Sequence, residues 1–103
     1  MITITKGISA ESKRIADHYG LIPEGDQLIE ECGELIQAMI KHRRYRDAVT
    51  AYHIFEEIAD VLAVTERYIY LFGADPEQVQ DIIREKTERE LYRIGGGEDV
   101  EST

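Results

Sequence analysis

Residues 54–71 read IFEEIADVLAVTERYIYL, and this stretch decides the fold class. A helix turns by about 100° per residue, so the apolar side chains here would cover well over half of its circumference. They are Ile54, Ile58, Val61, Leu62, Val64, Tyr68, Ile69 and Leu71. A helix that is apolar on so many sides is usually buried between several neighbours. The stretch predicts the central helix of an all-α bundle. Because the chain is short, we expect some of its neighbours to come from a second copy, which makes the protein a homo-oligomer.

The flanking sequence contains the signals for the other helices. Asp75-Pro76-Glu77 combines an N-cap, a proline at the first helical position and an acid in the first turn, and Gly73 precedes it. Ser9, Gly20, Pro23 and Gly95 supply further starts and stops. We expect helices at about 10–19, 24–43, 48–72 and 76–93. Short connections make consecutive helices antiparallel, which gives a four-helix-bundle-like fold.

The length of 103 residues is enough for one hydrophobic core and too small for two. We therefore assign residues 1–94 to a single all-α domain. The glycine-rich residues 95–103 are expected to form a flexible C-terminal tail, because such a composition cannot bury apolar surface. The alternating residues 1–5 are compatible with a short extended arm.

Charge and cysteine content argue against several function classes. Twelve Lys and Arg stand against 21 Asp and Glu, a net charge of −9, whereas nucleic-acid and anionic-membrane binding depend on clustered cations. A single cysteine excludes an internal disulfide framework and a cysteine zinc site. No apolar run approaches the ~20 residues of a membrane helix, and no secretory signal begins the chain. We expect a cytoplasmic protein without a nucleic-acid or membrane partner.

Two groups of acidic residues, EECGE at 30–34 and EEIAD at 56–60, carry the candidate chemistry. Each contains a pair three residues apart, which lies on one helical face, where two like charges repel unless a cation is bound. Glu57 falls inside the apolar face of its helix, and no Lys or Arg lies three or four residues away. A carboxylate there must be protonated, paired or bound to a metal. The alternative is a set of surface acids in an acidic chain.

Antiparallel packing of the two acid-bearing helices would bring four carboxylates together. They are Glu31, Glu34, Glu57 and Asp60. Four carboxylates without a thiol form a hard oxygen site, which suits Mg²⁺ or, alternatively, Mn²⁺. A di-iron site would need Glu-x-x-His, but Thr50 and Met39 occupy the positions three before His53 and His42.

The stretch from Gln27 to Leu35, followed by Glu57-Ile-Ala-Asp60, resembles the MazG-like all-α NTP pyrophosphatases, whose signature is EExxE and then ExxD. The resemblance spans about residues 15–93. It implies Mg²⁺-dependent cleavage of a nucleoside triphosphate to a monophosphate and pyrophosphate, in the service of nucleotide-pool housecleaning. It also implies an active site shared between subunits of a homodimer or homotetramer, with Glu31, Glu34, Glu57 and Asp60 as metal ligands.

The same resemblance assigns phosphate binding to the last helix. Lys86 matches the family's lysine, and Arg89 and Arg93 follow on the same side. Glu90 departs from the asparagine that many relatives carry. The alternative for these cations is a solvated face near the helix C-terminus. Glu34 and Glu30 are the candidates for the general base.

Three further features are open to two interpretations. His53 lies four residues before Glu57, where it either contacts the site or is a hydrogen-bonded residue near a helix start. Cys32 is expected in the core. The basic residues within 41–46 either attract a triphosphate or cap the second long helix. Two alternative functions also remain: a relative acting on dUTP, dCTP or phosphoribosyl-ATP, and a non-catalytic, cation-binding helical interaction module.

Overall fold

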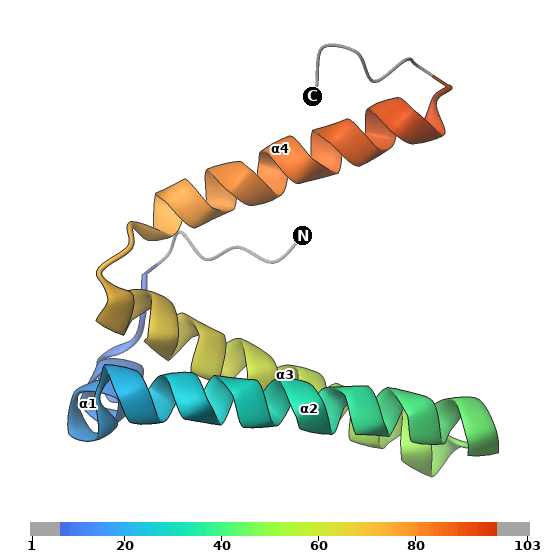
Figure 1. Cartoon of the computed structure of the whole chain (residues 1–103), viewed down its shortest axis with the longest axis horizontal. Helices are drawn as coiled ribbons and strands as arrows, with labels where there is room; N and C mark the ends of the chain where they lie inside the picture. Colours follow the sequence, from blue (N-terminus) through green and yellow to red (C-terminus); the bar gives the residue numbers. More distant parts are fainter. Residues whose placement is uncertain (1–6, 97–103) are drawn as a thin grey trace. The chain divides into compact units, whose positions relative to one another are not determined.

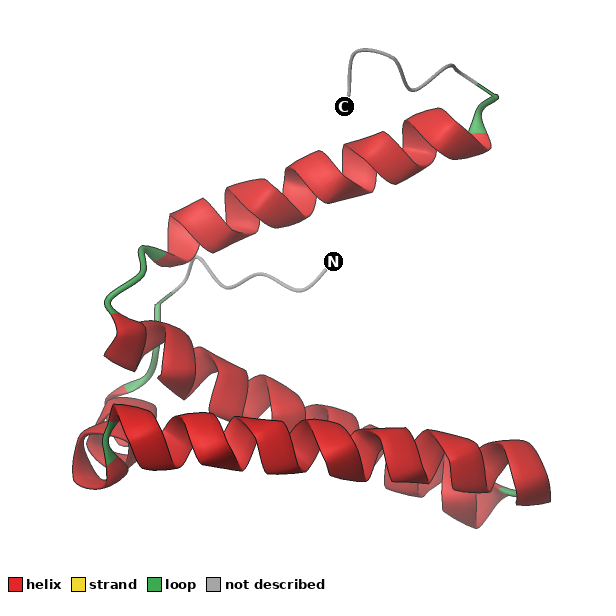
Figure 2. Cartoon of the chain, in the orientation of Figure 1, coloured by secondary structure: helices red, strands yellow, loops and turns green. Residues whose placement is uncertain are grey.

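A computed structural model describes residues 7–96, and every element within that range is an α-helix (Figures 1 and 2). The helices are α1 (Ala10–Tyr19), α2 (Leu21–Tyr45), α3 (Ala48–Phe72) and α4 (Pro76–Ile94). The all-α prediction with four helices is confirmed. None of these helices is long and apolar enough to cross a membrane. The predicted arm at residues 1–5 and the tail from residue 97 lie outside the described residues.

The first, third and fourth helices begin at the predicted capping signals. The Ser9 side chain accepts the N–H of Ser12 at 3.2 Å, and Asp47 accepts that of Thr50 at 2.8 Å. These contacts satisfy backbone donors that have no partner inside the helix. Gly20, at φ 87°, ends α1 and begins α2, and Gly73, at φ 80°, ends α3. Both angles lie in a region that glycine enters without steric cost.

The second helix is longer at both ends than the predicted range of 24–43. It begins at Leu21, so Pro23 is the third helical residue, which is tolerated because the first N–H groups of a helix lack intrahelical acceptors. It ends at Tyr45, where Arg46 adopts left-handed φ 51° and ψ 41° and donates its N–H to the carbonyl of His42 at 2.7 Å. The turn to α3 is therefore shorter than the sequence suggested.

The chain divides into two compact units. Residues Ile8–Gly73 form one of them, which contains α1, α2 and α3, and α4 belongs to the other. The assignment of residues 1–94 to a single domain stays a prediction.

Within the Ile8–Gly73 unit, α2 and α3 run antiparallel along their length, and α1 packs across one end of the pair (Figure 1). Side-chain contacts join α2 and α3 near both ends of the helix pair. Arg67 is ion-paired with Glu24 near the start of α2, and the Nδ1 of His42 lies 2.9 Å from the Oγ1 of Thr50 near its end. Tyr70 of α3 donates to Asp17 of α1 at 3.0 Å.

The core of this unit is small. Its buried apolar residues are Ala16, Ala38 and Val64, and Glu24 is buried as well, at 2% exposure. Both Glu24 oxygens accept hydrogen bonds from Arg67, one of them from Nη2 at 3.2 Å. A buried carboxylate is tolerated only with such pairing.

Many apolar side chains of α2 are exposed to solvent in a single chain. Ile29 is 73% exposed, and Ile36, Met39 and Ile40 are also exposed. The prediction of Cys32 as a core residue is wrong, because its side chain is exposed. The reason is that α2 meets α3 through a side of small and polar residues, with Leu28 and Leu35 half-buried at its edge, and Cys32 lies outside that side.

We predict that Glu24→Ala destabilises the protein by about 3 kcal/mol or more, because the Arg67 guanidinium is left largely buried without its counter-charge. Chemical denaturation with urea measures the change. The double variant Glu24→Leu, Arg67→Met is the control and should recover most of the loss, since it removes both charges at once. A Glu24→Ala variant as stable as the parent would contradict this account.

Candidate metal centre

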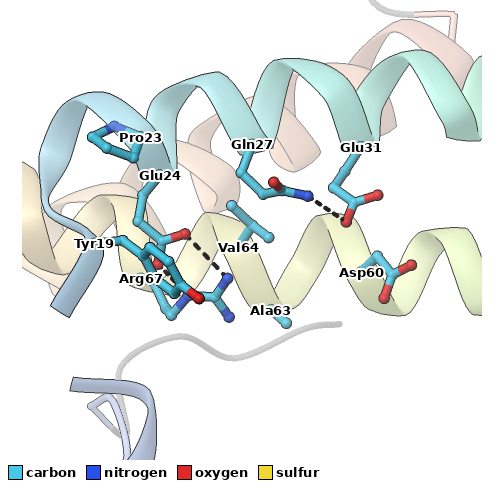
Figure 3. Close-up of a pocket in the computed structure, with 9 residues that line it drawn as sticks. All are labelled: Tyr19, Pro23, Glu24, Gln27, Glu31, Asp60, Ala63, Val64 and Arg67. Carbon is cyan, nitrogen blue, oxygen red and sulfur yellow. Dashed lines mark hydrogen bonds and ion pairs between the residues drawn. The ribbon is translucent and has the colours of Figure 1, made fainter. Parts of the chain in front are cut away.

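Three carboxylates from α2 and α3 meet at the interface of the antiparallel pair. They belong to Glu31, Glu57 and Asp60, and one oxygen of each lies within 4.8 Å of the others. Figure 3 shows Glu31 and Asp60 directed toward each other from facing helices. The structure thus brings together three of the four predicted ligands. Glu34, one turn along α2 from Glu31, lies outside this group of three.

Glu57 is buried at 9% exposure although its side chain ends in a carboxyl group. One of its oxygens, Oε1, lies 2.9 Å from the Nε2 of His53. The other, Oε2, is buried and has no hydrogen-bond partner among the described residues. An acceptor buried without a partner costs about 1–3 kcal/mol. Glu57 is therefore held by one oxygen while the other is left unsatisfied.

Glu31 repeats this arrangement from the opposite helix. Its Oε2 accepts a hydrogen bond of 3.1 Å from the side-chain amide of Gln27, four residues earlier (Figure 3). Its Oε1 is buried and has no hydrogen-bond partner among the described residues as long as the neighbouring Glu34 is ionised. Two unsatisfied carboxylate oxygens, each on a side chain fixed by a neighbour, are a fitting donor set for a hard cation.

The crowding of negative charge is also visible in the pKa values. Proton sharing with Glu31 is the main cause that raises the pKa of Glu34 to about 7, and desolvation and the charges of Glu31 and Glu57 add to it. Desolvation raises the pKa of Asp60 above its usual range, and the same two charges contribute. Near neutral pH the cation-free cluster therefore tends to hold a proton, which reduces its repulsion.

His53, four residues before Glu57, is hydrogen-bonded to that carboxylate, as one of the two interpretations of its position allows. The His53 side chain is 49% exposed, and it contacts the cluster through Glu57. Glu30 is exposed on α2, and its charge also raises the pKa of Glu34. Glu56 is exposed, as expected for a solvated acid.

The candidate phosphate-binding residues lie on α4, in the other unit. Lys86, Arg89 and Arg93 line a recess of about 290 Å³ together with Glu90. The Nη1 of Arg93 lies 2.8 Å from the Oε1 of Glu90. Glu90 thus forms an ion pair with one of the three cations.

The basic residues at 41–46 take part in ending α2. Arg46 is the left-handed cap, and its Nε donates to the carbonyl of Arg43 at 3.3 Å. This contact fits the capping interpretation, since cations stabilise helix C-termini.

A cavity of about 370 Å³ adjoins the carboxylates, and its other polar residues went unnoticed in the sequence (Figure 3). They are Glu24, Gln27 and Arg67. A signal for them exists: Glu24, Gln27 and Glu31 are three and four residues apart, so they share one face of α2. Arg67 lies seven residues after Asp60, which places it on the same face of α3, two turns further along.

Comparisons of the chain with models of protein families, with curated proteins and with solved structures returned no match. The likeness to the MazG-like pyrophosphatases therefore depends on the spacing of the acidic residues in the sequence.

We predict that Glu57→Gln raises the stability of the protein in the presence of a chelator by about 1 kcal/mol, or about 4–8 °C in Tm. The substitution removes a buried negative charge from a crowded cluster and supplies an amide donor. Glu56→Gln, which alters an exposed neighbour, is the matched control and should stay within about 0.5 kcal/mol of the parent. Calorimetry measures both variants, and a lower Tm for Glu57→Gln would show that the carboxylate is well satisfied as it stands.

Proposed function

We propose that this chain is a Mg²⁺-dependent nucleoside triphosphate pyrophosphohydrolase of the MazG-like kind, which cleaves a ribo- or deoxynucleoside triphosphate to a monophosphate and pyrophosphate. The observation that carries the proposal is the pair of unsatisfied, buried oxygens on Glu31 and Glu57, together with Asp60 within 4.8 Å. A surface cluster of acids would be hydrated and would need no cation. The order EExxE and then ExxD adds support from the sequence.

Glu31, Glu57 and Asp60 are the residues that would hold the ion, with Glu34 as a fourth candidate at the edge of the group. Carboxylate oxygens are the ligands that magnesium prefers, and manganese accepts the same set. When bound, the ion neutralises carboxylate and phosphate charge and supplies a Lewis acid to the phosphoryl oxygens. Without it, a triphosphate would be repelled by the cluster.

In the reaction, a water oxygen forms a bond to phosphorus, the bond between the α and β phosphates breaks, and pyrophosphate leaves. The water releases one proton, which a carboxylate must accept. Glu34, one turn from Glu31, and Glu30, exposed on the same helix, are the candidates for this role. Gln27 and His53 act as positioning residues, since each holds one oxygen of a ligand carboxylate.

Lys86, Arg89 and Arg93 complete the proposal as phosphate-binding residues. Their support is the recess on α4 that they line together. Guanidinium and ammonium groups bind phosphate oxygens through charge-assisted hydrogen bonds. We propose a cytoplasmic setting and a role in nucleotide-pool housecleaning.

Homo-oligomerisation is part of the same proposal, and the open face of α2 supports it. Ile22, Ile29 and Ile36 are all exposed and recur every seven residues, so they form one line along the helix. This line lies on the side of α2 opposite Gln27 and Glu31. A contiguous apolar face of this kind marks a protein interface, and we propose a homodimer or homotetramer.

The test of the activity is pyrophosphate release from a panel of ribo- and deoxynucleoside triphosphates, dUTP and dCTP included, and from phosphoribosyl-ATP. We expect release that depends on Mg²⁺ and that falls on the order of 100-fold or more in Glu57→Gln, because a ligand of the ion is lost. Glu56→Gln should keep the parent rate. Added Mg²⁺ should also raise the Tm of the parent and leave that of Glu57→Gln unchanged.

Two outcomes would overturn the assignment. If Glu57→Gln still releases pyrophosphate at the parent rate, the active site does not lie at this cluster. No release from any substrate, together with a Mg²⁺-dependent rise in Tm, would favour the non-catalytic cation-binding module.

The oligomer has its own test. Light scattering on the purified chain should give two or four times the 11.8 kDa of one copy, and Ile29→Asp should shift it toward the monomer, because a charge would be buried in the interface. Lys41→Asp, exposed on the same helix but about 120° from the apolar line, is the control. A monomeric parent chain would refute this part of the proposal.

A further inference from the structure

The cavity beside the acid cluster lies between α2 and α3 (Figure 3). Its volume of about 370 Å³ falls in the range of small-molecule sites. Glu31 and Asp60 line one end of it and belong to the acid cluster as well. A ligand whose phosphates lie at the cluster can therefore extend directly into the cavity. Tyr19, Glu24 and Arg67 lie toward the other end.

The far end of the cavity carries a fixed hydrogen-bond donor. Arg67 uses Nε and Nη2 to bind the two oxygens of Glu24, which is almost fully buried. A guanidinium held at both of these nitrogens has its plane fixed. Its third nitrogen, Nη1, has no hydrogen-bond partner among the described residues, and Arg67 lines the cavity. Both oxygens of Glu24 already accept hydrogen bonds from Arg67, so Glu24 is poorly placed to accept a hydrogen bond from a ligand.

The spacing along α3 leaves room for a nucleoside. Asp60 and Arg67 are seven residues apart, which corresponds to about 10.5 Å of helical rise. The ring of Tyr19, 57% exposed, lines the same cavity and offers an aromatic face. Aromatic faces stack on any nucleobase and do not distinguish one base from another. Discrimination between bases therefore depends on Arg67, the hydrogen-bond donor at the far end of the cavity.

We infer that the cavity holds the nucleobase of the substrate and that Arg67, fixed by Glu24, selects bases with a keto oxygen at the edge it contacts, such as hypoxanthine, guanine or uracil. This inference rests on the proposed function. Arginine has only donors, so it pairs with a keto oxygen and leaves an amino group without an acceptor. Sites built on one such hydrogen bond reject the analogue that cannot make it.

The experiment compares two purine pairs, ITP with ATP and inosine with adenosine, in which a keto oxygen replaces the amino group at position 6 and N1 gains a hydrogen. We expect kcat/KM for pyrophosphate release from ITP to exceed that from ATP by about tenfold or more, the effect of one charged hydrogen bond. A second readout needs no turnover: an NMR titration of the chain with inosine and with adenosine, in chelator, follows the Nε–H signal of Arg67. Inosine should bind more tightly by a similar factor.

The deciding variant is Arg67→Lys, which keeps a positive charge for Glu24 but has a single nitrogen and so lacks the counterpart of Nη1 that faces the cavity. It should reduce the preference for the keto base to less than about threefold. Arg84→Lys, which alters an exposed arginine ion-paired with Asp81 on α4, is the matched control and should leave the preference unchanged.

The possible results separate this inference from the proposed function. Equal rates with ITP and ATP, or a preference unchanged in Arg67→Lys despite a lower Tm, would overturn it and limit Arg67 to a structural role. Tighter binding of inosine without any pyrophosphate release would overturn the enzymatic proposal and retain the base selectivity of the cavity.

Discussion

Charged groups at the interface of α2 and α3 are the constraint on which the rest of the structure depends. Antiparallel helices are usually joined by apolar side chains, but here the contact surface carries the Glu24–Arg67 ion pair, the three clustered carboxylates and the His42–Thr50 contact. Ala38 and Val64 are its buried apolar residues, and Leu28 and Leu35 are half-buried at its edge. Each buried charge must be compensated, because the helices cannot close over it otherwise.

This constraint explains both the small core and the open apolar face. A helix that turns its polar edge toward its neighbour must turn its apolar edge elsewhere. Ile29 and Ile36 are consequently exposed in a single chain, although the hydrophobic effect favours their burial. Self-association is the simplest arrangement that satisfies both requirements, and it agrees with the short length of the chain.

The two kinds of charge at the interface differ in their compensation. The ion pair is complete, since both oxygens of Glu24 accept from Arg67. The acid cluster is incomplete, since Glu31 and Glu57 each retain a buried oxygen without a partner among the described residues. At one end of the cavity the carboxylate of Glu24 is thus neutralised by Arg67, whereas at the other end no described cation neutralises the acid cluster. That asymmetry is the basis for placing an ion and phosphates at the cluster and a base near Arg67.

The amino-acid sequence by itself determined the four helices, since caps, glycines and apolar periodicity are local properties. It also indicated that Glu57 lies in an apolar face, because helical geometry fixes that angle. It did not determine which edge of α2 meets α3, and so it misplaced Cys32 in the core and overlooked Gln27 as the partner of Glu31. It left the role of His53 open between two interpretations, and the structure pairs this residue with Glu57. The cavity and the pairing of Glu24 with Arg67, 43 residues apart, were decided by the tertiary structure alone. Such contacts depend on the register between two helices, which no local pattern specifies.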